Sequence, residues 1–131
     1  MIGKRTSVSQ DATEKYEADT ALARQFDELL ERARAAEQEF RDAQAAGAPE
    51  DRLRSLGKQL DAALTDVMRA AFAAQRVEIG PRGYDDWIFR RQAMATSKVH
   101  ALTREAQRLL TLRETHRLSG IVRSPRVSTP A

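Results

Sequence analysis

The chain has 131 residues, of which 41% are hydrophobic and 31% are charged, and none is cysteine. Its length fits one domain, and the lack of thiols excludes disulfides, Cys-based zinc sites and thiol redox chemistry. No run of apolar residues approaches the roughly 20 that a membrane span needs, and no apolar signal segment follows the N-terminus. We therefore expect no membrane partner and a cytoplasmic location.

The charge is distributed unevenly, although the net charge is only +3. Residues 16–81 carry nine Lys or Arg against thirteen Asp or Glu, whereas residues 82–131 carry ten against four. Two glycines, one proline and the only tryptophan fall at this boundary, between residues 79 and 87. We expect a hinge over residues 80–86 that joins an acidic part to a basic part.

The first predicted element is a helix from Asp11 to Ala46. It begins with a pattern that resembles a capping box, Asp11-Ala12-Thr13-Glu14, and it is stopped by Gly47 and Pro49. Its apolar residues are spaced alternately by four and three, which is the spacing of a heptad seam. They are Leu22, Phe26, Leu29, Ala33, Ala36, Phe40 and Ala43.

A second predicted helix, from Pro49 to Val77, repeats the apolar seam and is weakened slightly by Gly57. The connection around Gly47 is short, so the two helices should run antiparallel. Residues 13–79 are thus predicted to form an acidic, coiled-coil-like helical hairpin. Its seam is rich in alanine, which buries little area, so the hairpin needs a third layer or another subunit.

The third predicted helix covers residues 87–118 and is amphipathic and basic. Asp85 is the expected N-cap, Asp86 the expected first-turn acid, and Gly120 the terminator. The fold class is therefore all-α, with flexible arms predicted over residues 1–12 and 119–131. Cations on the third helix and the tail either form an ordinary solvated face or contact phosphates or an acidic surface. The ones that we single out are Lys98, Arg104, Arg108, Arg123 and Arg126.

No motif for catalysis or cofactor binding is present. His100 and His116 are sixteen residues apart, about 24 Å along one helix, so we expect two surface histidines and no metal site. Capping explains Asp85 and Asp86, and residues 80–83 lack the lysine and hydroxyl of a phosphate loop. We expect no enzyme activity, no cofactor and no small-molecule substrate.

Three bulky residues, Trp87, Ile88 and Phe89, follow one another at the start of the third helix. Successive side chains on a helix point about 100° apart, so all three cannot face one core. Either they pack against the ends of the first two helices, or Trp87 or Phe89 anchors a partner. Neighbouring Arg90 and Arg91 complete a composition that is typical of interface hot spots.

These features predict a non-enzymatic structural or assembly subunit of a larger multi-protein particle. Its partners would be proteins, including copies of itself, and a phage-like virion or tail is one setting, suggested by analogy. The location would then be cytoplasmic or inside a virus-like particle. An accessory nucleic-acid-binding protein that uses the basic helix and tail is one alternative, and a helical adaptor or antitoxin-like regulator is another.

Overall fold

The computed structural model of the protein describes residues 8–120, which form helices and turns and contain no strand. The all-α prediction is confirmed for this part of the chain. Residues 1–7 and 121–131, most of the two predicted arms and with them Arg123 and Arg126, lie outside the described residues. The helices are α2 (Gln10–Ala23), α3 (Phe26–Ala45), α4 (Glu50–Ile79), α5 (Trp87–Met94) and α6 (Ser97–Thr115), with a 3₁₀ turn η1 (Pro81–Tyr84) and a π turn η2 (His116–Gly120).

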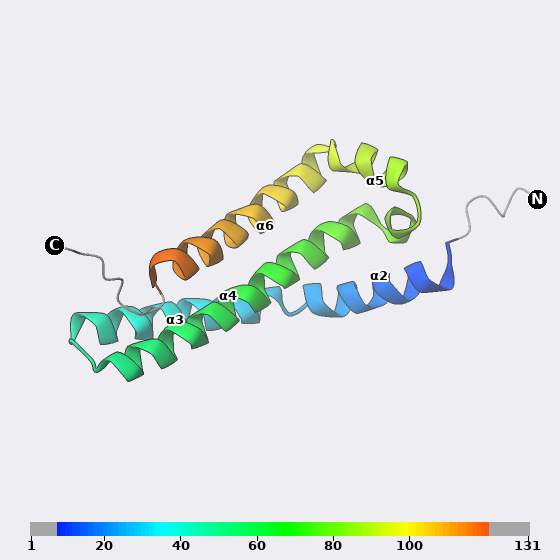
Figure 1. Cartoon of the computed structure of the whole chain (residues 1–131). Helices are drawn as coiled ribbons and strands as arrows, with labels where there is room; N and C mark the ends of the chain where they lie inside the picture. Colours follow the sequence, from blue (N-terminus) through cyan, green and yellow to red (C-terminus); the bar gives the residue numbers. More distant parts are fainter. Residues whose placement is uncertain (1–7, 121–131) are drawn as a thin grey trace, which may run out of the picture.

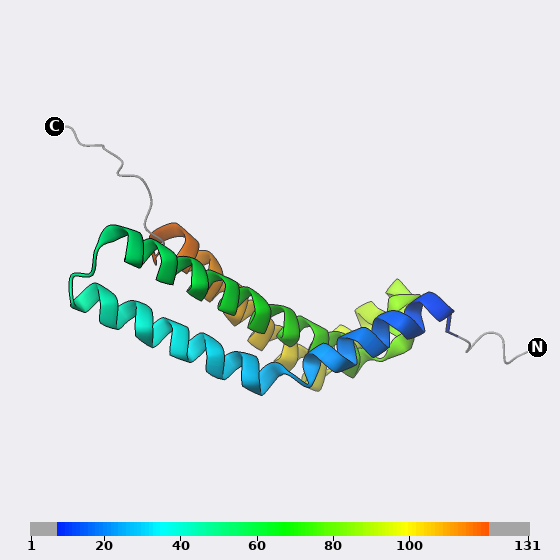
Figure 2. The same cartoon turned by 90° about the horizontal axis from the view of Figure 1, so that it is seen from below.

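Helix α4 is the central element of an elongated molecule (Figure 1). Helices α2 and α3 follow one another along one side of α4, and α6 returns along another side. Figure 2 shows α3 and α4 as neighbouring antiparallel helices joined by a short turn. The start of α2, η1 and α5 gather at one end of the molecule, and the α3–α4 turn lies at the other.

The core follows α4 along its length. Leu60 and Val67 of α4 pack with Leu29 of α3 and Leu109 of α6, and all four are at least nine-tenths buried. Ala106 of α6 is fully buried, which lets α6 approach α4 closely. The seven apolar positions of the predicted first seam are all buried or half-buried, so their spacing identified the face that turns toward α4.

The predicted helix over residues 11–46 is wrong in one respect, because it is two helices. The chain leaves the α-helix at Arg24 and Gln25, where the Gln25 N–H donates to the Leu22 carbonyl at 3.0 Å in a tighter turn. Both residues keep right-handed backbone angles that any residue adopts. Without a Gly or Pro, the break has no local signal in the sequence.

The predicted helix over residues 87–118 is also divided. Thr96 is extended, with φ −72° and ψ 151°, and its hydroxyl donates to the Ala93 carbonyl at 2.7 Å. Such a local hydrogen bond competes with the helical pattern. The α-helix then ends at Thr115 and gives way to η2. The division lets α6 lie along α4 while α5 sits at the end of the molecule (Figure 1).

Helix capping at two positions differs from the prediction. Asp86, not Asp85, is the N-cap of α5, and its carboxylate accepts from the Phe89 N–H at 3.0 Å. Asp85 instead accepts two hydrogen bonds of 2.8 Å from Ser9, one from the N–H and one from the hydroxyl. Ser9 is the N-cap of α2, a place that the sequence pattern had given to Asp11. Asp85 therefore ties the start of α2 to residues 80–86, which we call the joint.

Two glycines are needed where the chain turns from α4 into η1. Gly80 has a φ of 100°, which other residues rarely adopt. Gly83 is buried against Ile79, and a Cβ added to it would lie 2.6 Å from Cγ2 of that isoleucine. The joint is therefore a tightly packed turn that folds back on the end of α4.

A polar network fastens α2 to this joint. Asp19 of α2 accepts two hydrogen bonds from Arg76 of α4, at 2.7 and 3.1 Å, and a third from the hydroxyl of Tyr84 in η1. Burial acts to raise the pKa of Asp19, but hydrogen bonds from Arg76 and Tyr84 outweigh it and lower the pKa. Only Ala12 is fully buried in α2, so this network adds contacts where apolar burial is limited.

Replacing Asp19 by Asn should lower the free energy of unfolding by about 1–3 kcal/mol, because Arg76 loses its carboxylate. Urea denaturation followed by circular dichroism measures the change. Glu17→Gln is the matched control, since it removes the same charge from an exposed position of α2 and should change the free energy by less than about 0.5 kcal/mol. Equal effects of the two substitutions would contradict a specific role for Asp19.

The same network gives a pH dependence of stability. Because the folded-state pKa of Asp19 lies below its ordinary value of 3.8, its contribution is complete above that value and is lost as the pH falls through the folded pKa. Acid should therefore destabilise the wild-type chain more than Asp19→Asn between pH 5 and pH 2. If the wild type and Asp19→Asn lost equal stability over this pH range, other carboxylates would be the main cause of the acid sensitivity.

His116 corrects another prediction, because it is buried and not a surface residue. Its side chain is 8% exposed, its ring packs edge-on against Phe40 of α3, and its Nε2 donates to the Gly57 carbonyl of α4 at 2.8 Å. The ring therefore joins three elements at the end of α6. His100, by contrast, is exposed as predicted.

His116→Ala should destabilise the fold by about 2–3 kcal/mol, because it removes the side-chain hydrogen bond to the Gly57 carbonyl and opens a space beside Phe40. His100→Ala, at an exposed position of α6, provides the control and should have almost no effect. Thermal unfolding of the two variants, compared with the wild type, measures the difference. A stable His116→Ala protein would mean that the contact contributes little.

Candidate functional site

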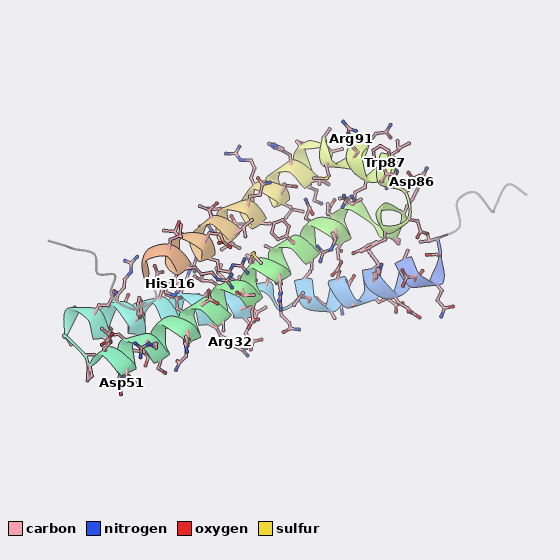
Figure 3. All side chains as sticks on the ribbon, in the orientation of Figure 1. Arg32, Asp51, Asp86, Trp87, Arg91 and His116 are labelled. Carbon is pink, nitrogen blue, oxygen red and sulfur yellow. The ribbon has the colours of Figure 1, made fainter. Side chains whose placement is uncertain are left out.

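The largest apolar side chains left uncovered at the joint are Trp87 and Ile88. Trp87 is 65% exposed and Ile88 is 55% exposed, and α5 as a whole has no fully buried residue. Figure 3 shows Trp87 and Arg91 together on α5, at the end of the molecule opposite Asp51. We call Trp87 and Ile88 the α5 patch.

Phe89 is the member of the bulky triplet that turns toward the protein. It is half-buried, and the Arg82 guanidinium lies 4.5 Å from the centre of its ring. The Arg91 guanidinium lies 6.0 Å from the centre of the Trp87 ring, at the outer limit of a cation–π contact. Of the two aromatic residues singled out in the sequence, Phe89 thus belongs to the joint, and Trp87 belongs to the surface beside Ile88.

A hollow of about 300 Å³ lies beside the α5 patch. Its walls come from the end of α4, from η1 and from the start of α5, and Trp87 forms one side. The lining residues are Arg76, Ile79, Gly80, Gly83, Tyr84, Asp85, Trp87 and Arg90. No pattern of residues indicated this hollow, because it forms only when η1 folds back on α4.

The electrostatics of the patch are set by Arg90 and Arg91. No carboxylate of residues 8–120 forms an ion pair with either guanidinium. The other two arginines of the joint do have partners, since Arg76 pairs with Asp19 at 2.7 Å and Arg82 pairs with Asp86 at 3.3 Å. The positive charge that the joint leaves unneutralised is therefore next to the α5 patch.

Two of the basic residues singled out on the third helix are paired within the chain. Lys98 pairs with Glu78 of α4 at 3.4 Å, and Arg108 pairs with Glu105 at 2.8 Å. Of Lys98, Arg104 and Arg108, Arg104 alone has no carboxylate partner among the described residues. Arg117 of η2 also pairs with Asp61 of α4 at 2.6 Å, and this hydrogen bond lowers the pKa of Asp61.

Trp87→Ala should leave the fold intact and lower the free energy of unfolding by less than about 1 kcal/mol, because most of the ring is in water. Leu109→Ala serves as the contrast: Leu109 is 1% exposed, and its truncation should cost about 2–5 kcal/mol. Chemical denaturation of both variants measures the two changes. A large loss for Trp87→Ala would place the ring in the core and remove the patch.

Within residues 8–120, no helix is long and apolar enough to cross a membrane, and no three His, Asp or Glu side chains come together as ligands for a metal ion. Comparison with known proteins found no matching family model, no matching curated protein and no matching solved structure.

Proposed function

We propose that the protein is a non-enzymatic assembly subunit that joins a larger multi-protein particle through the α5 patch. The observation that carries this proposal is the exposure of Trp87 and Ile88 beside a hollow at the end of the molecule. Contiguous exposed apolar side chains, especially a tryptophan with arginines around it, are typical of protein-binding surfaces.

The energetics suit a binding role. Burial of a large apolar side chain contributes roughly 1.5–3 kcal/mol, so covering Trp87 and Ile88 would supply a large share of the energy of a moderate complex. The tightly packed joint holds α5 in place through Phe89 and Arg82. A patch on an already ordered helix loses little conformational entropy when a partner binds.

Nucleic-acid binding is the second candidate, and fewer observations favour it. Arg90, Arg91 and Arg104 are the cations of the predicted surface that lack a carboxylate partner among the described residues. They do not form the dense basic stripe that binding to phosphates would use. An adaptor or antitoxin-like regulator would use the same patch as the assembly subunit, and it differs only in binding one partner instead of entering a particle.

The proposal can be tested with a tagged full-length chain expressed in its natural host. Gradient sedimentation of a gentle lysate should place the wild-type chain in fractions far heavier than the purified chain alone. Trp87→Ala/Ile88→Ser should move it to the light fractions. Leu112→Ser, a substitution at another exposed apolar position (44% exposed), is the control and should leave the chain in the heavy fractions.

Two results would contradict assembly through the patch. A wild-type chain that sediments as a free monomer would exclude a particle, and a double variant that stays in the heavy fractions would exclude the patch as the contact. Treatment of the lysate with nuclease distinguishes nucleic-acid binding from assembly into a protein particle. A complex built on nucleic acid should fall apart, whereas a protein particle should not.

A further inference from the structure

We propose that the partner covering the α5 patch is an acidic segment of a different protein chain. A bulky apolar side chain of this segment enters the hollow beside Trp87, and its Asp or Glu residues pair with Arg90 and Arg91. This inference rests on the proposed function, because it specifies the chemistry of the partner at the same surface.

The hollow fits one large side chain. Its volume of about 300 Å³ is at the lower end of the range of small-ligand pockets, roughly 300–1,000 Å³. Apolar atoms of Ile79 and Trp87 contribute to its walls, and the exposed Trp87 and Ile88 side chains extend the apolar surface beyond it. Such a site is typical of the pockets that receive an apolar anchor residue.

The charged residues around the hollow indicate which kind of segment flanks the apolar residue that enters it. The carboxylate of Asp85 also lines the hollow, but Ser9 donates to both of its oxygen atoms at 2.8 Å, and Asp86 is occupied by Phe89 and Arg82. Arg90 and Arg91 have no such partner. A carboxylate from another chain would pair with them on the rim, which aids recognition and the rate of association.

The chain's own ends have the wrong charge to cover the patch. Residues 1–7 contain Lys4 and Arg5 and no acid, and residues 121–131 contain Arg123 and Arg126 and no acid. Either segment would bring cations against Arg90 and Arg91. Neither of these two segments therefore has the charge of the occupant that we propose.

A second copy is also a poor occupant. In a symmetric dimer the same patch meets itself, so Arg90 and Arg91 would face their own copies. Acids without an ion-pair partner among the described residues, such as Glu17, Asp27 and Asp66, lie on exposed helix surfaces that carry no large exposed apolar side chain. Any self-association would thus use another surface.

The test uses the full chain and a phage-displayed library of random 12-residue peptides, with selection on the wild type and counter-selection on Trp87→Ala. Enriched peptides should combine Asp or Glu with a large apolar residue. Trp87 is the only tryptophan of the chain, so the tryptophan fluorescence of the protein reports on this one ring. Binding of a synthetic enriched peptide that contains no tryptophan should cover the ring and shift the Trp87 emission to shorter wavelength. Titration of this signal gives the dissociation constant.

Charge reversal separates the proposed contact from general electrostatics. Arg90→Glu should weaken the peptide about tenfold or more, whereas Arg104→Glu, which makes the same change in net charge at an unpaired arginine on α6, should weaken it by less than about twofold. Replacing the peptide's Glu by Gln should reduce its affinity for the wild type about as much as Arg90→Glu reduces the affinity of the original peptide. A Lys substitution in the peptide should restore binding to Arg90→Glu.

Three results would overturn the inference. The enriched peptides could lack acids, Arg90→Glu and Arg104→Glu could weaken peptide binding equally, or no peptide could be enriched on the wild type over the Trp87→Ala variant. Light scattering that shows a dimer dispersed by Arg90→Glu or Trp87→Ala would also overturn it in favour of a second copy. The sedimentation experiment stands apart from these outcomes, because a chain found in a particle keeps the proposed function even when the selected peptides are neutral.

Discussion

The carboxylate of Asp19 is the point at which the end of the molecule is fastened together. It binds Arg76 of α4 and Tyr84 of η1 at the same time, so it fixes α2, α4 and η1 relative to one another. Since η1 leads directly into α5, the position of Trp87 depends on this contact. A partly buried polar network around one residue thus helps to fix the orientation in which the α5 patch is presented.

Much of the fold follows from the spacing of apolar residues, because burial along α4 requires one continuous face on each neighbouring helix. The positions from Leu22 to Ala43 were identified correctly in this way. The break at Arg24 and Gln25 was missed, since it keeps helical backbone angles and contains neither Gly nor Pro. His116 was also missed, because its partner, the Gly57 carbonyl, is brought to it by the tertiary fold alone.

The candidate site was predictable in part. The triplet at Trp87 signalled that one side chain must face outward, but the geometry of η1 decided that Trp87 and Ile88 do so and Phe89 does not. Among the basic residues of the third helix, pairing was foreseeable for Arg108, because Glu105 lies one helical turn before it. It was not foreseeable for Lys98, whose partner Glu78 comes from another helix.

The long sequence separation of the contacts that hold α2 has a consequence for how the chain folds. Ser9 meets Asp85 across 76 positions, and Asp19 meets Tyr84 across 65, whereas α3 and α4 are adjacent in the chain. Loop closure over such distances is slow compared with pairing of neighbouring helices. During synthesis α2 emerges well before η1, so its contacts with Asp85 and Tyr84 can form only after the joint has been made.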